Sequence, residues 1–165
     1  FTIQKLDTAW EKKHFSAIFG CARSDDPAEE THFVMLLRLS VASTRSNALQ
    51  LFSTQGYFYS LIRGQRDVAG LSAELHRNLR VNENRSIVLE GFLISLHPAQ
   101  NLMRIQAFGR HLAYRDESGW SWIRETPPLG AEDFEQGELI ELRPRKDVIV
   151  SMREYPLLLI SGGMG

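Results

Sequence analysis

The second half of the chain, from residue 86 to residue 161, is a succession of short apolar segments divided by turn sequences. The dividing sequences include PAQN, DESG and RPRKD. Connections this short join antiparallel strands, because parallel neighbours need a crossover of about a dozen residues or more. The pattern therefore predicts an antiparallel sheet and argues against the parallel sheet of an α/β protein.

The first half of the chain adds further strands to this sheet. Residues 32–43, HFVMLLRLSVAS, alternate apolar side chains in the manner of a strand. Residues 48–64, ALQLFSTQGYFYSLIRG, are interpreted as two shorter strands with Gly56 in the turn between them. Together these segments predict the start of an antiparallel meander.

Two helices are predicted beside the strands. The first covers Thr8–Phe19, where Thr8 and Glu11 form a capping box and the aromatic residues share one helical face. The second follows Asp67 as its N-cap, because apolar residues then recur at intervals of three and four, at Val68, Leu71, Leu75 and Leu79. The predicted fold is α+β, with a curved or partly closed antiparallel sheet of about seven strands and two helices.

Length and charge limit what such a chain can be. We expect residues 1–165 to form a single α+β domain, and the start at Phe1 leaves open that they are a fragment of a longer chain. The formal net charge of −1 gives no general attraction to nucleic acid or to an anionic membrane. No apolar run approaches the ~20 residues of a membrane helix. With Cys21 as the only cysteine, a disulfide within the chain is excluded, and a cytoplasmic location is favoured.

The sequence lacks the motifs of the common catalytic and cofactor sites. It contains neither of the two glycine-rich phosphate-binding patterns, G-x-x-x-x-G-K-S/T and G-x-G-x-x-G. It also lacks the G-x-S-x-G sequence that surrounds the nucleophile of many hydrolases. Its five histidines are dispersed, without the spacing of a metal site. We therefore predict no catalytic residue, no cofactor and no metal. An enzyme with a site assembled from scattered residues is a lesser alternative, with His97 and His111 as its acid–base candidates.

Two basic clusters are candidates for contact with a polyanion or a protein partner. One lies at the predicted end of the second helix and the other in a predicted hairpin loop, and their members are Arg77, Arg80, Arg85, Arg143, Arg145 and Lys146. Such arginines can bind phosphate groups, or they can satisfy helix carbonyls and keep the surface charged. The second role is the commoner one in a chain without excess positive charge.

The hairpin around DESG raises a further question, because it combines aromatic rings with arginines. A two-residue turn would place Arg115 beside Trp120 and create a mixed basic and aromatic face. That turn type calls for positive φ at its two central residues, which Glu117 and Ser118 tolerate poorly.

A three-residue turn with Gly119 in the left-handed conformation is therefore favoured. It would pair Tyr114 with Trp122 and separate most of the rings from the charges. The predicted aromatic surface then consists of Tyr114, Trp120 and Trp122, covered either by the protein's own helices or by a ligand or partner.

These observations predict a non-catalytic protein-binding or assembly module, a subunit of a larger complex. A protein partner or self-association is expected, with no membrane insertion and no small-molecule ligand. The alternative is a single-stranded nucleic-acid-binding domain that uses loop arginines for phosphates and Tyr57 or Tyr59 for base stacking.

Overall fold

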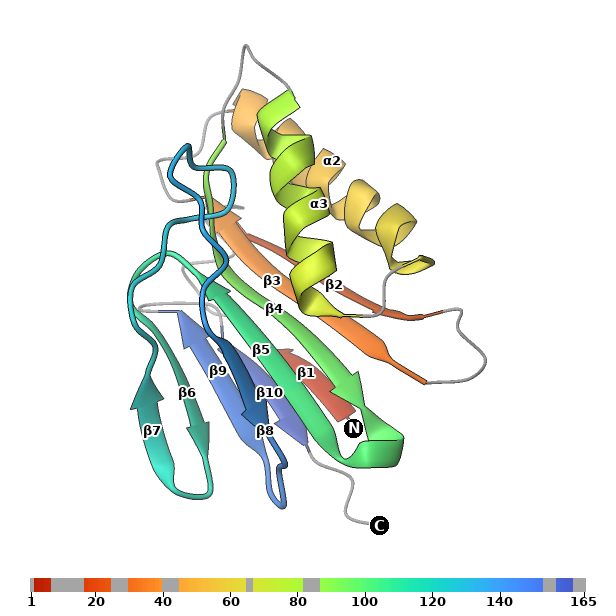
Figure 1. Cartoon of the computed structure of the whole chain (residues 1–165), viewed down its shortest axis with the longest axis vertical. Helices are drawn as coiled ribbons and strands as arrows, with labels where there is room; N and C mark the ends of the chain where they lie inside the picture. Colours follow the sequence, from red (N-terminus) through yellow and green to blue (C-terminus); the bar gives the residue numbers. More distant parts are fainter. Residues whose placement is uncertain are drawn as a thin grey trace.

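The chain folds into two antiparallel sheets that face each other, with two helices on one side (Figure 1). The structure is a computed structural model, and it describes residues 2–6, 17–24, 30–39, 45–64, 67–81, 87–152 and 157–161. Among these residues there are ten strands and two long helices: β1 (Thr2–Leu6), β2 (Ala17–Arg23), β3 (His32–Leu39), α2 (Arg45–Ile62), α3 (Val68–Val81), β4 (Leu89–His97), β5 (Leu102–Phe108), β6 (Leu112–Asp116), β7 (Gly119–Trp122), β8 (Leu139–Leu142), β9 (Val148–Met152) and β10 (Leu157–Ser161). The predicted α+β class with antiparallel strands is confirmed, but the described strands form two sheets of five and not one curved or partly closed sheet of about seven.

The strands divide equally between the two sheets. The hairpin sheet has the order β1-β10-β9-β6-β7, and the helix-covered sheet has the order β2-β3-β4-β5-β8. Apolar side chains from the inner faces of both sheets fill the space between them. On β9, for example, Val148, Val150 and Met152 are buried while Ile149 and Ser151 between them are partly exposed. This alternation follows from the two-residue repeat of a strand.

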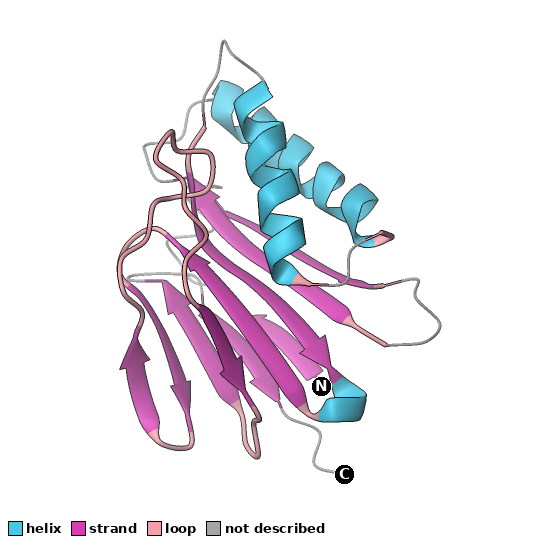
Figure 2. Cartoon of the chain, viewed as in Figure 1, coloured by secondary structure: helices cyan, strands magenta, loops and turns pink. Residues whose placement is uncertain are grey.

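Both helices lie on the outer face of the helix-covered sheet, as Figure 2 shows. A second apolar layer joins them to that sheet, with Phe58 of α2 and Leu75 of α3 packed among residues such as Phe33 and Met35. In the described part of the chain, no helix packs on the outer face of the hairpin sheet. Within the described residues, one face of the sandwich is therefore covered by helices and the other is not.

The second predicted helix is confirmed as α3. The carboxylate oxygen Oδ1 of Asp67 accepts a hydrogen bond from the backbone N–H of Gly70 at 2.7 Å, which is the expected N-cap interaction. All four apolar residues of the predicted helical stripe are buried: Val68, Leu71, Leu75 and Leu79.

The prediction of two strands over residues 48–64 is wrong, because this segment belongs to the helix α2. Its buried residues are three or four positions apart, at Leu51, Thr54, Phe58 and Ile62. The aromatic side chains between them favoured strands, but Phe52 and Tyr59 point to solvent. Gly56 lies on the exposed side of the helix and makes no turn.

The first predicted helix, Thr8–Phe19, is wrong at its end and untested before it. Residues 17–19 belong to the strand β2, which pairs with β3 in the helix-covered sheet. Residues 8–16 lie outside the described residues.

Near Gly109 the apolar positions of the sequence change face, a pattern that indicates a bulge. The structure instead ends β5 at Phe108 in the helix-covered sheet and begins β6 at Leu112 in the hairpin sheet. Gly109 and His111, at the crossing, have positive φ values of 96° and 57°. The apolar positions change because the chain passes from one sheet to the other.

The long connection between β7 and β8, residues 123–138, climbs beside α3 (Figure 1) and is called the strap below. Leu129 of the strap is buried and exchanges backbone hydrogen bonds with Leu89. Phe134 stacks on His76 of α3, with ring centroids 4.2 Å apart. The strap therefore closes the helix end of the sandwich.

None of the described helices is both long enough and apolar enough to cross a membrane.

Candidate functional site

The β6–β7 hairpin adopts the register that the sequence disfavoured. Arg115 pairs with Trp120 and Asp116 with Gly119, so that only Glu117 and Ser118 lie between the strands. The predicted pairing of Tyr114 with Trp122 is wrong, since Tyr114 faces Ser121. The separation of rings from charges that was derived from it is wrong as well.

The turn avoids the positive φ values that argued against it. Among the described residues, Glu117 and Ser118 are not in the positive-φ region, and Gly119 carries the positive φ, at 116°. The Asp116 carboxylate accepts hydrogen bonds from both the backbone N–H and the hydroxyl of Ser118. These bonds lower the pKa of Asp116, with the hydroxyl of Ser118 as the largest cause. A side-chain-stabilised turn thus replaces the turn type assumed from sequence.

This register builds a row of side chains across the outer face of the hairpin sheet, because residues that pair across antiparallel strands share a face. The row crosses all five strands and is called the outer row: Gln4, Leu159, Ile149, Arg115 and Trp120. Trp122 lies on the same face, one pair further along β7. The exposed fractions of Trp120 and Trp122 are 52% and 74%, so neither ring is covered by the described protein.

Tyr114 does not belong to this exposed face. It alternates with Ala113 and Arg115 along β6, so its ring points to the space between the sheets. There it is half-buried against the apolar layer that includes Val150 and Ile160. The predicted aromatic surface is therefore divided between the two faces of the sheet.

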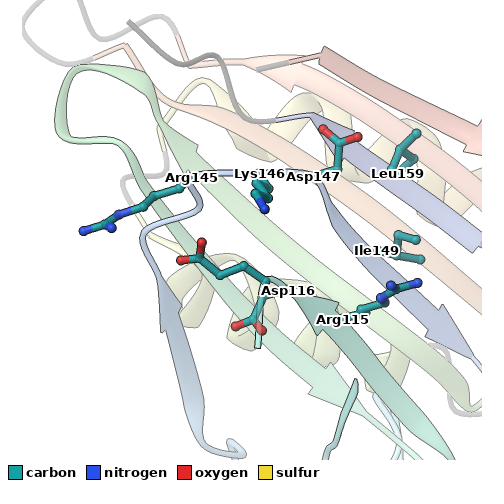
Figure 3. A pocket seen from close by; sticks show the side chains of 8 residues that line it. Arg115, Asp116, Arg145, Lys146, Asp147, Ile149 and Leu159 are labelled. Atoms are coloured by element: carbon teal, nitrogen blue, oxygen red, sulfur yellow. The ribbon is translucent and has the colours of Figure 1, made fainter. Parts of the chain in front are cut away.

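The β8–β9 loop brings cations beside the outer row. A hollow of about 650 Å³ lies between this loop and the hairpin, and Figure 3 shows side chains of β6, the loop, β9 and β10 around it. Its lining consists of Arg115, Asp116, Glu117, Arg145, Lys146, Asp147, Ile149 and Leu159. Arg143 lines a smaller crevice on the same loop, beside Asp116 and Glu117.

The cations around the hollow and the crevice have no ionic partners in the described part of the chain, although carboxylates lie near them. This holds for all four of them: Arg115, Arg143, Arg145 and Lys146. Asp116, the carboxylate nearest to Arg115 in sequence, is hydrogen-bonded within its own turn. The cationic groups are thus available to charges from outside the protein.

The other predicted basic cluster is arranged differently. Arg77 forms an ion pair with Glu74 at 2.6 Å, and Arg80 forms one with Glu132 of the strap at 3.6 Å. Arg85 lies outside the described residues. Figure 1 shows the C-terminal end of α3 and the β8–β9 loop at opposite ends of the molecule, so the six predicted cations do not form one surface.

The residues considered for an enzyme or for base stacking do not gather at a common site. His97 is buried, with its two ring nitrogens at hydrogen-bond distance from the hydroxyls of Thr31 and Ser95, at 3.3 Å and 3.0 Å. His111 is an exposed residue at the crossing between the sheets. Tyr57 and Tyr59 lie on α2, over the other sheet.

No group of three or more histidine, cysteine, aspartate or glutamate side chains close enough to hold a metal ion occurs within the described ranges. Burial raises the pKa of the Cys21 thiol, which lies on β2 and is half-buried.

The sequence matches no protein-family model, and no curated protein matches it significantly. Solved structures do share its fold. One described as "The bacterial stressosome: a modular system that has been adapted to control secondary messenger signaling" has a TM-score of 0.61 at 14% identity, over 90% of this chain and 73% of that chain. RsbX in complex with magnesium has a TM-score of 0.54 at 11% identity, over 90% and 69%.

The RsbU and RsbW domains of Rv1364c from Mycobacterium tuberculosis have a TM-score of 0.56 at 10% identity. That match covers 82% of this chain and 42% of the other. At such identities the likeness shows the fold alone. It supports the α+β fold described above.

Sequence reasoning missed the members of the outer row other than Trp120. Arg115 enters the sequence argument only with the disfavoured turn, and Ile149 and Leu159 lie in apolar segments that predict strands without marking a site. The missed signal is Asp116-x-Ser118, because an aspartate followed two residues later by a serine can close a turn through its side chain.

Proposed function

We propose that this chain is a non-catalytic protein-binding module that acts in the assembly of a larger complex. The observation that carries the proposal is the outer row together with Trp122: two exposed tryptophans, an arginine without an ionic partner among the described residues and two aliphatic side chains share one sheet face. Tryptophan and arginine are the residues that most often dominate the energy of protein interfaces. Monomeric proteins seldom leave such a face uncovered.

The chemistry of the face indicates what the partner presents to it. Ile149 and Leu159 form an apolar floor, and Arg145 and Lys146 stand beside it without ionic partners in the described structure. A protein segment with apolar side chains and carboxylates complements both features. A chain of the stressosome structure described above shares the fold, and the description of that structure as a modular system supports a role in assembly.

The test compares proteins recovered with the wild-type chain and with two variants by affinity purification and quantitative mass spectrometry. Arg115→Glu reverses a charge in the outer row and should abolish recovery of the specific partner, because the cation would become a repulsive carboxylate. Phe52→Ser is the matched control, since Phe52 is 58% exposed but lies on α2. Equal recovery by wild type and Arg115→Glu would contradict the proposal.

A single-stranded nucleic acid is the second candidate, because the observed register places Trp120 directly beside Arg115. Aromatic stacking next to a cation is how such proteins hold bases and phosphates. The net charge of −1 opposes this function. We expect a fluorescein-labelled oligonucleotide to show no anisotropy change at low salt, and a change lost in Trp120→Ser would favour this candidate instead.

A further inference from the structure

The free edge of the hairpin sheet is the strand β7, which ends the strand order. The backbone N–H of Ile123 donates to the carbonyl of Leu112 at 2.8 Å, toward β6. Because backbone direction alternates along a strand, Ser121 also faces β6, whereas Trp120 and Trp122 direct their N–H and C=O groups outward. No described residue forms a backbone hydrogen bond with these outward groups.

Apart from its shortness, at four residues, this edge lacks the features that usually prevent edge-to-edge pairing. Natural edge strands carry lysine, proline or a bulge, which block the approach of another strand. The sequence of β7, Gly-Trp-Ser-Trp, contains none of them, and its two tryptophans are exposed. The edge is therefore open to a further strand.

We propose that a second copy of this chain pairs with β7 in the antiparallel direction, about a two-fold axis through Ser121. In this register Trp120 of each copy lies opposite Trp122 of the other. All the outward N–H and C=O groups of both tryptophans then have partners within β7 of the other copy. The indole rings lie on one face and contact each other across the new pair of strands.

Charged residues of the two copies come near each other at both ends of this pairing. Arg124, two residues beyond β7, comes opposite Ser118 and next to Glu117 of the second copy. Arg124 and Glu117 have no ionic partner among the described residues. Glu125, which would otherwise face Glu117 of the second copy, is already paired with Arg110. Because successive residues of an extended strand point to opposite faces, Arg124 and Glu117 form no direct pair, and the ion pair of Glu125 with Arg110 offsets the repulsion between Glu125 and Glu117.

The expected dimer is weak. A tryptophan side chain can bury about 150–250 Å², and the exposed fractions of the two rings are 52% and 74%. Two copies together then cover roughly 400–600 Å² of indole surface. Stable interfaces bury at least about 1,200 Å². The dimer should therefore depend on protein concentration.

The first test is a cysteine substitution on the proposed axis, in a Cys21→Ser background. In Ser121→Cys the two thiols face each other across a non-hydrogen-bonded pair, where Cα atoms are about 4.5 Å apart, within the range a disulfide needs. Oxidised glutathione should convert this variant to a covalent dimer, being itself reduced to glutathione. Ser53→Cys, an exposed cysteine on α2, is the control and should stay largely monomeric.

The second test measures mass by light scattering over a range of concentrations. Wild type should show a rising average mass. Trp122→Pro should stay monomeric, because proline removes an outward N–H that β6 does not use. Trp122→Lys, which adds the usual protective charge, should do the same if the proline variant fails to fold.

A wild type that remains monomeric at all concentrations would overturn the inference, as would equal cross-linking of Ser121→Cys and Ser53→Cys. Arg115→Glu separates this inference from the proposed function, because Arg115 lies on the sheet face and not at the edge. It should lose the partner protein and keep the dimer. Failure of one proposal therefore leaves the other standing.

Discussion

The two ends of the sandwich use their charged and aromatic side chains in opposite ways. At the helix end, Arg80 of α3 pairs with Glu132, and Phe134 of the strap stacks on His76. At the hairpin end, Arg145 and Lys146 have no ionic partner in the described structure, and Trp122 is 74% exposed. The difference teaches that residue type does not by itself mark a binding surface: the same kinds of residue serve stability at one end and are available for contact at the other.

The largest expected effect on the free energy of unfolding comes from comparing a buried with an exposed aromatic residue. Phe58→Ala should lower the free energy of unfolding by about 3–5 kcal/mol, because the ring is fully buried under the helices. Trp122→Ser should change it by no more than about 0.5 kcal/mol, since most of the indole is in solvent. Urea denaturation measures both. A large loss in Trp122→Ser would show that the hairpin face is part of the core.

A smaller effect is expected at the contact between the strap and α3. His76→Ala should cost about 1–2 kcal/mol, because it removes the ring stack and the hydrogen bond from the backbone N–H of Gly130 to Nδ1 of His76. His76→Phe is the control that keeps a ring on Phe134 and loses only the hydrogen bond.

The same contact should make stability depend on pH. Burial, and then the charge of Arg80, lower the pKa of His76 below its ordinary value of about 6.5. The unfolded chain therefore takes up a proton first as the pH falls, and the stabilising contribution present above pH 6.5 is lost from there downward until the folded pKa is passed. Wild type should lose more stability than His76→Phe between pH 8 and pH 5.

The smallest effect is expected for the exposed cations. Arg80→Ala should cost at most about 1 kcal/mol, and less at high salt, because it removes a surface ion pair. Arg145→Ala should have no measurable effect on unfolding, because Arg145 has no ionic partner among the described residues. Thermal melts at low and high salt compare the two variants. A loss in Arg145→Ala that salt removes would show that the loop cations stabilise the fold.

The parts of the fold that depend on local pattern were predictable. The alternation in β3 and the three-and-four spacing in α3 each correspond to one element, and the N-cap at Asp67 was identified from its residue type. The helix α2 was not predicted, because its exposed aromatic residues favour strands. They hide the helical spacing of its buried residues, which is visible only once the exposed ones are known. Local preference gave way there to packing on the helix-covered sheet.

The candidate site was only partly predictable. The cations of the β8–β9 loop and the two tryptophans were identified as candidates from their types and positions. Their combination with Arg115 was not, because a shift of one residue in the hairpin register moves every side chain to the other face. That register depends on hydrogen bonds of the Asp116 side chain, which the assumed turn type did not include.

The sequence by itself determined the α+β class, the antiparallel direction of the strands and the helix α3, because these follow from periodicity and connection length. Only the tertiary structure decided that the strands form two sheets, since the crossing at Gly109 depends on which partners β5 and β6 find. It also decided which arginines are paired and which tryptophans are exposed. Those properties depend on contacts between residues far apart in the chain, and no local pattern encodes them.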